Sequence, residues 1–130
     1  MHWMLMPLRR YAEFSGRSQR KEYWMFVLLN VILGAVVLGA LAVTYYTRMS
    51  ETAMTALLTP LFFLHGLASL VFIIPGLAVT VRRLHDTGRS GWNILLGLIP
   101  IIGPFLLLVF YITDGTSGPN RFGPDPKTAS

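Results

Sequence analysis

The stretch RRLHDTGRSGW, residues 82–92, packs five ionisable side chains into its first eight positions. His85 stands beside Asp86, and an imidazole next to a carboxylate suits acid–base catalysis. A metal or hydrolytic site would need more: the chain has no cysteine, only His2 and His65 as further histidines, and no G-x-S-x-G, H-E-x-x-H or P-loop pattern. We therefore expect no catalytic residue, no metal ion and no cofactor, with a membrane-embedded enzyme that uses His85 and Asp86 as an alternative.

Charged residues gather at a second place, the stretch FSGRSQRKEYW at residues 14–24. If both stretches lie at one membrane face, their basic side chains can form a pocket for the phosphate of a lipid headgroup. The alternative is a structural clamp, in which Asp86 pairs with an arginine of residues 14–24 while Glu22 pairs with Arg82 or Arg83. Asp86 motivates the clamp, because an anion in the last turn of a helix opposes the helix dipole and does little for topology. The candidate binding residues for either role are Arg17, Arg20, Glu22, Trp24, Arg82, Arg83, His85, Asp86, Arg89 and Trp92, with Lys21 beside them.

The elements that position these residues are expected to be helices in a membrane. The chain has 130 residues, of which 53% are hydrophobic and 13% charged, about half of the 25% or so that is typical of soluble domains. Residues 23–47, 52–81 and 90–113 contain no Asp, Glu, Lys or Arg. Each run exceeds the roughly 20 residues that a helix needs to cross a bilayer. The sequence thus predicts an all-α membrane protein with three transmembrane helices in a single domain, residues 1–130.

Turn and cap residues suggest where the spans begin and end. Ser18 is the expected N-cap of span 1, residues 19–46, and Thr59-Pro60 is the expected start of span 2, residues 60–86, after a short surface helix from Ser50-Glu51 to Leu58. Gly88 should stop span 2, and Ser90 should cap the next helix. Residues 1–18 are expected to lie in the headgroup layer, and residues 114–130 to form an irregular or mobile tail.

Span 3, residues 91–113, is interrupted by Pro100, Gly103 and Pro104. Either one broken helix crosses the membrane, or two half-helices enter and return. Three crossings with a cytoplasmic N-terminus place eight basic residues inside and three outside, whereas a re-entrant third segment makes this ten against one. We expect three crossings, with re-entry as the alternative. The net charge of +5 then marks cytoplasmic loops and contact with anionic headgroups, and no nucleic-acid partner is expected.

Four segments carry a family resemblance: FSGRSQRKEYW, RRLHDTGRSGW, the break LIPIIG, and GPNRFGPDP in the tail. In this order they resemble the small bacterial inner-membrane proteins grouped as domain of unknown function 805. The resemblance spans about residues 11–127 and implies a multi-pass protein of the bacterial cytoplasmic membrane, built as one helical unit, with no assigned activity. It implies a shared but unnamed role for the residues at the motif positions, which are Arg17, Arg20, Glu22, Trp24, Arg82, Arg83, His85, Asp86, Gly91, Trp92, Asn120, Gly123 and Pro126.

These observations favour a non-enzymatic helical unit that binds lipids or a partner protein through a basic cytoplasmic face. Membrane lipids, anionic ones in particular, are the expected partners, with a homo-oligomer or another membrane protein as alternatives. The second hypothesis is an oligomeric transport component, which the broken span 3 and His65 motivate.

Overall fold

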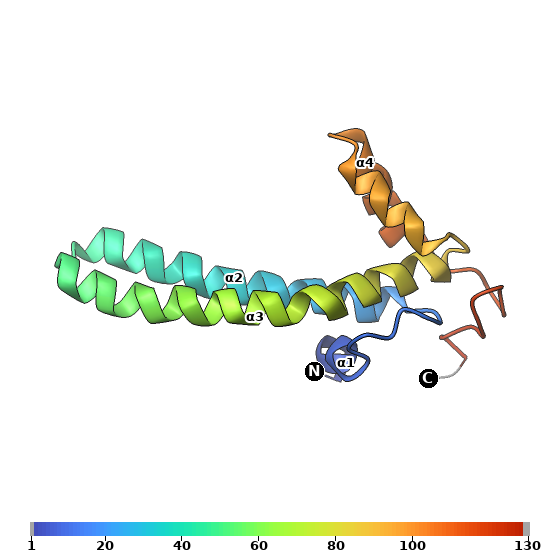
Figure 1. Cartoon of the computed structure of the whole chain (residues 1–130), viewed down its shortest axis with the longest axis horizontal. Helices are drawn as coiled ribbons and strands as arrows, with labels where there is room; N and C mark the ends of the chain where they lie inside the picture. The colour runs from blue at the N-terminus through green and yellow to red at the C-terminus, as the bar shows by residue number, and fades with distance from the viewer. Residues whose placement is uncertain (1, 129–130) are drawn as a thin grey trace.

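Two long antiparallel helices dominate the structure, a computed structural model that describes residues 2–128. The end at which α2 (Arg20–Thr47) begins and α3 (Glu51–Asp86) ends is called the proximal end, and the opposite end of the pair the distal end. α1 lies against the proximal end, η1 and α4 project from it, and the tail from residue 113 onward lies beside it (Figure 1). In chain order the elements are α1 (His2–Arg9), α2 (Arg20–Thr47), α3 (Glu51–Asp86), the 3₁₀-helix η1 (Gly91–Leu98) and α4 (Ile102–Ile112).

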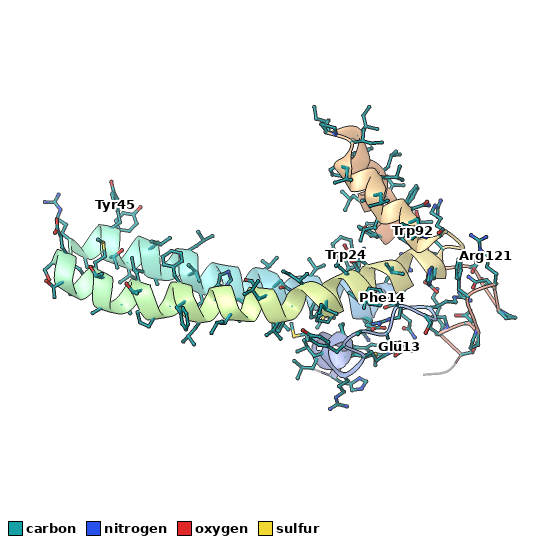
Figure 2. All side chains as sticks on the ribbon, viewed as in Figure 1. Glu13, Phe14, Trp24, Tyr45, Trp92 and Arg121 are labelled. Atoms are coloured by element: carbon teal, nitrogen blue, oxygen red, sulfur yellow. The ribbon has the colours of Figure 1, made fainter. Side chains whose placement is uncertain are left out.

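α2 and α3 are long and apolar enough to cross a membrane. They contain 28 and 36 residues, which extend to about 42 and 54 Å at 1.5 Å per residue. Only 11% and 6% of the residues in their most apolar 18-residue windows are buried. A core helix of a soluble protein would be mostly buried, so this exposure indicates contact with lipid. Tyr45 lies near the distal end of the pair and Trp24 near the proximal end (Figure 2), as expected for aromatic residues at two interfaces.

α3 is one continuous helix, and the predicted break before Pro60 is wrong. Ser50 caps its start, where the Ser50 hydroxyl oxygen accepts a hydrogen bond from the amide of Ala53 at 3.4 Å. Pro60 and Pro75 both lie inside the helix. A proline removes only one backbone hydrogen bond, and a helix remains the way to satisfy the other backbone groups of a segment that faces lipid.

The start of α2 also differs from the prediction. The helix begins at Arg20 with Gln19 as its N-cap residue, and Gln19 makes no side-chain capping bond. Ser18, the predicted cap, donates its hydroxyl proton to Glu22 Oε2 at 2.7 Å instead. The ionised Glu22 in the first turn is the stronger acceptor for that hydroxyl, and it still complements the helix dipole.

The third apolar segment is a hairpin in the structure, not a third long helix. η1 has eight residues and α4 has 11, and α4 extends to only about 16 Å, half of a hydrocarbon core. The chain turns at the predicted break, where Ile101 has a φ of 66°. Gly103 is required there, because a Cβ atom at this position would overlap the carbonyl group of Leu96. α4 therefore runs back to the proximal end, as in the re-entrant alternative.

A small hydrophobic core lies where α2, α3 and the hairpin meet. Leu84, Leu107 and Tyr111 are buried together, and the rings of Tyr23 and Tyr111 lie 4.7 Å apart. This core fixes the base of the hairpin against the proximal end, directly beside the charged residues described next.

Candidate functional site: an ion-pair cluster at the proximal end

Five buried charged side chains form ion pairs with one another at the proximal end of the helix pair. The last turns of α3 supply three of them, α2 supplies one, and the loop before α2 supplies the fifth. We call this set the ion-pair cluster: Arg17, Glu22, Arg82, Arg83 and Asp86, which are 5%, 2%, 0%, 0% and 2% exposed. Charged residues are almost never fully buried unless they are paired, and here every one has an ionic partner.

Arg82 and Glu22 form the first half of the cluster. Arg82 Nη2 donates to Glu22 Oε1 at 2.8 Å, and Arg82 Nη1 donates to the carbonyl oxygens of Glu13 and Arg10. The amide of Ser18 donates to the Arg82 carbonyl oxygen at 3.1 Å. Residues 10–18 are thereby wrapped over the end of α3.

Arg10 and Glu13 form a more exposed ion pair at the edge of this half. Arg10 Nε lies 2.6 Å from Glu13 Oε2, and this hydrogen bond lowers the pKa of the Glu13 carboxyl group. Arg10 also lies 4.0 Å from Glu22. The loop before α2 is thus held by charge at both of its ends.

Asp86 is the centre of the second half. Arg17 Nε donates to Asp86 Oδ1 at 3.0 Å, and Arg83 donates to Asp86 Oδ2. Both pairings of the clamp hypothesis are therefore present: Asp86 with an arginine of residues 14–24, and Glu22 with Arg82. Arg83, one turn before Asp86 on α3, is an additional partner, whereas Arg82 is not a partner of Asp86.

Arginine side chains also explain why the hairpin returns to the proximal end. Arg83 donates to the carbonyl oxygens of Tyr111, at 3.2 Å, and Thr113. Arg20 donates to the carbonyl oxygen of Ile112 at 3.2 Å. The last carbonyl groups of a helix lack partners within it and carry partial negative charge, so guanidinium groups stabilise the end of α4 at this place.

The tail after α4 is irregular, as predicted, but it is docked onto the cluster. Arg17 donates to the carbonyl oxygens of Thr116 and Gly118, and the Thr116 amide donates to the Asp86 carbonyl oxygen at 2.9 Å. Gly115 passes so close to the Asp86 carboxylate that a Cβ atom at this position would overlap it.

The three motif residues of the tail fix its path. Asn120 Nδ2 donates to the His85 carbonyl oxygen at 3.0 Å, and Asn120 and Gly123 exchange two backbone hydrogen bonds, where Gly123 has a φ of 138°. The Pro126 carbonyl oxygen accepts from Gln19 Nε2. The tail thus connects the end of α3 with the start of α2.

His85 lies beside the cluster but is not part of its ion pairs. Its Nδ1 lies 3.1 Å from the Gly16 carbonyl oxygen, and its ring stacks on Phe122 with centroids 3.9 Å apart. Asp86, its neighbour in sequence, is engaged by two arginines. The pair therefore lacks the mutual hydrogen bond that an acid–base dyad would use, and the geometry gives the enzyme alternative no support.

The remaining predicted residues lie at the rim of the proximal end. Arg20 pairs with Asp114 at 2.8 Å, both side chains being largely exposed, and the guanidinium of Arg89 lies 4.0 Å from the ring centroid of Phe110. Trp24 and Trp92 are 36% and 78% exposed. Lys21 is exposed as well, with its ammonium group 5.6 Å from the Trp3 ring centroid.

The six basic residues of the predicted phosphate pocket are divided between the buried cluster and the rim. Three of its six arginines and lysines, Arg17, Arg82 and Arg83, are buried and bind carboxylates and carbonyl oxygens. Within residues 2–128, Arg82 Nε is the only buried side-chain nitrogen or oxygen without a hydrogen-bond partner. The buried arginines hold the fold, and of the six predicted residues Arg20, Lys21 and Arg89 lie outside the cluster, at the rim.

Three residues that were not predicted as site residues also contribute to the cluster: Ser18, Gly115 and Thr116. Ser18 acts through its hydroxyl group, Thr116 through its amide, and Gly115 through the absence of a side chain. None of these groups is charged, so the search for charged residues in the sequence could not find them. The one available hint was the position of Gly115-Thr116 directly after the third apolar run, where a re-entrant chain would pass the arginines.

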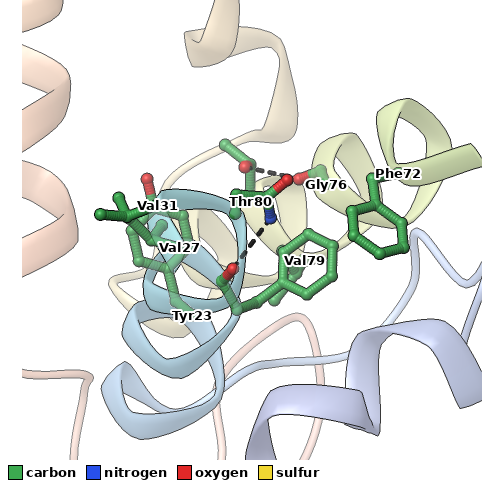
Figure 3. A pocket seen from close by; sticks show the side chains of 9 residues that line it. Tyr23, Val27, Val31, Phe72, Gly76, Val79 and Thr80 are labelled. Carbon is green, nitrogen blue, oxygen red and sulfur yellow. Dashed lines mark hydrogen bonds between the residues drawn. The ribbon is translucent and has the colours of Figure 1, made fainter. Parts of the chain in front are cut away.

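A hollow of about 440 Å³ opens between α2 and α3 within the apolar region (Figure 3). Of its polar lining residues, Asn30 and Thr80 bond carbonyl oxygens of their own helices, those of Phe26 and Gly76, and Tyr23 is the third. Within residues 2–128 the side chain of His65, which motivates the transport hypothesis, makes no hydrogen bond to a neighbouring helix. No continuous polar path through one chain follows from these groups, so the transport alternative gains no support from the single chain.

Taken together, the fold and the cluster define a small helical membrane protein, whose two long apolar helices are held at one end by buried ion pairs. The chain belongs to the family of proteins of unknown function DUF805, whose model matches residues 11–124. It is 45% identical to the inner membrane protein YhaI of Escherichia coli K12, over 130 residues that cover 100% of this chain and 99% of the relative. It is 46% identical to the inner membrane protein YhaH of the same strain, over 98% of both chains. No solved structure matches it.

Membership of this family confirms the resemblance that the four motif segments indicated. The uncharacterized protein YiiR of Escherichia coli K12 is a more distant relative, 32% identical over 88% of this chain and 86% of the relative. The similarity to YhaI and YhaH identifies the chain as an inner-membrane protein.

Proposed function

We propose that this protein is a non-enzymatic membrane unit that binds anionic lipid headgroups, or a partner protein, through the rim of its proximal end. In this proposal α2 and α3 cross the membrane, the proximal end faces the cytoplasm, and the hairpin of η1 and α4 enters only the cytoplasmic leaflet. The observation that carries the proposal is the contact between Arg17 and the tail carbonyl groups of Thr116 and Gly118. It keeps the tail at the same end of the helix pair as the loop before α2.

The distribution of basic residues supports this orientation. With both chain ends in the cytoplasm, the only lysine or arginine on the other side is Arg48, between α2 and α3, and the other ten lie at the proximal end. An excess of arginine and lysine in short loops marks the cytoplasmic side. The re-entrant arrangement therefore fits the charge pattern better than three crossings do.

The rim supplies the positive charge for binding because the cluster cannot. Besides Lys21 on α2, the exposed basic residues of the rim include Arg9 on α1 and Arg121 in the tail. Each basic residue near an anionic membrane surface contributes about 1 kcal/mol of attraction, so three rim charges suffice for a measurable preference. The buried cluster serves this role indirectly, since it fixes the three elements that present the rim.

Lipid retention by the purified full-length chain tests the proposal. We expect native mass spectrometry in mild detergent to show more retained dioleoyl phosphatidylglycerol than phosphatidylcholine. The triple variant Arg9→Glu, Lys21→Glu, Arg121→Glu should lose this preference, and added salt should weaken it in the unmodified protein, because salt screens exposed charges.

Arg48→Glu is the matched control, since it reverses a charge at the distal end and should leave the preference unchanged. Equal retention of the two lipids by the unmodified protein would argue against lipid binding at the rim, as would an equal loss in the Arg48→Glu variant.

A further inference from the structure

A groove of about 470 Å³ lies between the end of α3 and the start of the hairpin. Leu77, Val81 and His85 line it from α3, and their spacing of four residues places them on one face of the helix. Ser90 and Ile94 line it from the other side, at the cap and within η1. The volume lies within the range of about 300–1,000 Å³ that is typical of small-molecule sites.

The groove is polar at one end and apolar at the other. His85 and Ser90 lie at the α3–η1 turn, whereas Leu77 and Ile94 lie about two turns and one turn away from it along their helices. Trp92 and Phe14, at 78% and 43% exposed, form the outer walls. This gradient matches an amphiphile whose polar group remains at the membrane surface while its chain runs toward the bilayer centre.

Gly91 brings η1 close enough to α3 to make this groove. A Cβ atom at Gly91 would lie 2.7 Å from Val81 Cγ1 and 3.4 Å from His85 Nε2. The absence of a side chain at this position therefore leaves His85 Nε2 at the floor of the polar end.

The polar end offers one hydrogen-bond acceptor and one donor. His85 Nδ1 lies 3.1 Å from the Gly16 carbonyl oxygen, and because a carbonyl group only accepts, the ring proton belongs on Nδ1. Nε2 is then an acceptor, and within residues 2–128 it has no hydrogen-bond partner. Ser90 Oγ accepts from the Trp92 amide at 3.4 Å, so its hydroxyl proton is free to donate.

We propose that this groove binds one acyl chain of a glycerophospholipid whose headgroup donates a hydrogen bond to His85 Nε2. The inference rests on the proposed membrane placement, because α3 and the hairpin then present the groove to lipid. An ethanolamine ammonium or a glycerol hydroxyl supplies such a donor, and a choline headgroup does not. Ser90 donates to a phosphate or ester oxygen of the same lipid, and the acyl chain lies along Leu77, Val81 and Ile94.

Lipid is the favoured occupant because of where the groove lies. Leu77 is 44% exposed, and it continues the exposed apolar surface that α3 presents along its length. In a bilayer, acyl chains surround this surface, and an unfilled void beside it would lose dispersion contacts. The paired donor and acceptor at the turn then select among the lipids that are present.

The experiment is competition among lipids at high salt, which suppresses the charge-driven binding at the rim. The full-length protein is exchanged into equimolar dioleoyl phosphatidylethanolamine and phosphatidylcholine, both zwitterionic, and retained lipid is measured by native mass spectrometry. A parallel mixture of phosphatidylglycerol and phosphatidylcholine distinguishes an ammonium donor from a hydroxyl donor. We expect one retained lipid per chain and an enrichment of the donor-bearing lipid in at least one mixture.

Leu77→Trp fills the apolar end of the groove and should reduce lipid retention about tenfold or more. The bulky ring would displace part of the acyl chain, and the loss of only a few buried methylene groups weakens binding by that factor. Ile74→Trp is the matched control, one turn away on α3 and 40% exposed, and should retain lipid. His85→Asn keeps a donor for the Gly16 carbonyl oxygen and removes Nε2, so it should keep the lipid but lose the headgroup preference.

Equal retention of phosphatidylcholine by the unmodified protein in both mixtures would overturn the proposal without reliance on any variant. Unchanged lipid retention in the Leu77→Trp variant would also overturn the proposal. So would a dimer of the unmodified protein that Leu77→Trp abolishes, because it would assign the groove to a second copy of the chain. The rim proposal fails separately, through the variant Arg9→Glu, Lys21→Glu, Arg121→Glu, which should leave binding in the groove unaffected.

Discussion

Arg17 and Asp86 lie 69 positions apart in the chain and form a buried ion pair, with Arg17 Nε 3.0 Å from Asp86 Oδ1. The pair joins the loop before α2 to the last turn of α3. Because Arg17 also binds the carbonyl oxygens of Thr116 and Gly118, it joins both to the tail. One side chain therefore holds together the three parts of the chain that meet at the proximal end.

Asp86→Ala should be among the most destabilising substitutions in this protein. It leaves Arg17 and Arg83 buried without their carboxylate, and breaking a buried ion pair in this way costs about 3–5 kcal/mol. The measurement is thermal or denaturant unfolding of the purified protein in detergent. Asp114→Ala is the control, since Asp114 is a 61% exposed partner of Arg20, and its loss should cost no more than about 1 kcal/mol. Similar losses for the two variants would contradict the central position of Asp86.

The two halves of the cluster should respond differently to exchange of charges. Glu22 and Arg82 face one another directly at 2.8 Å, so Glu22→Arg with Arg82→Glu should recover part of the stability that either single variant loses. Arg17→Asp with Asp86→Arg should recover less, because the new arginine would face Arg83. Unfolding of the four single and two double variants measures this. Equal recovery of both pairs would show that Arg83 is not a significant partner of Asp86.

The two long helices and the clamp could be predicted from sequence because their signals are local. Charge-free runs mark α2 and α3 by length alone, and Asp86 stands out because it opposes the helix dipole at the end of α3. Arginines of both charged stretches were available as partners for Asp86 and for Glu22. The sequence left open which of the arginines binds which carboxylate, since that depends on the rotation of the helices about their axes.

The hairpin and the docked tail could not be settled in the same way. A 24-residue apolar run, residues 90–113, is as compatible with a broken crossing as with re-entry. The deciding contacts are those of Arg83 and Arg20 with the carbonyl groups at the end of α4, and backbone carbonyl groups leave no trace in a sequence. The predicted helix start at Pro60 was wrong for a related reason. Pro60 lies inside α3, because a lipid-facing segment satisfies its other backbone groups best by staying helical.

Gly103→Ala should destabilise the hairpin. The added methyl group would overlap the Leu96 carbonyl group where η1 and α4 touch, and forced overpacking of this kind costs about 1–3 kcal/mol. Hydrogen exchange of η1 and α4 amides measures the effect at its site. Gly34→Ala is the matched control on α2, because a Cβ atom there meets nothing within 4 Å. A hairpin that exchanges at the same rate in both variants would show that the close contact at Gly103 is not needed.

Asp125 should make docking of the tail sensitive to acid. Its carboxylate accepts hydrogen bonds from the amides of Lys127 and Gly118, at 2.9 and 3.0 Å, and these bonds lower its pKa. A carboxyl group with a lowered pKa in the folded state stabilises that state above its ordinary pKa, and the contribution is lost as the pH falls through the lowered value. The tail should therefore be fully docked at pH 7 and loosen only below about pH 4.

The variant Asp125→Asn removes the carboxylate charge at neutral pH and so tests whether that charge holds the tail. Hydrogen exchange at the Gly118 and Lys127 amides should be faster in this variant than in the unmodified protein at pH 7. The Thr116 amide, which donates to Asp86, should change less and serves as an internal control. Equal exchange at Gly118 and Lys127 in the two proteins would mean that the charge of Asp125 does not hold the tail.

The proposed orientation predicts which positions an impermeant thiol reagent can reach in intact cells. The chain contains no cysteine, so single substitutions give an unambiguous signal. Ser50→Cys lies between α2 and α3 and Ser117→Cys lies in the tail, and both positions are exposed. Because the hairpin returns the chain to the proximal end, Ser50→Cys should react from outside and Ser117→Cys only after the inner membrane is permeabilised. Reaction of both positions from outside would instead place the tail across the membrane and require that η1 and α4 straighten into a third crossing.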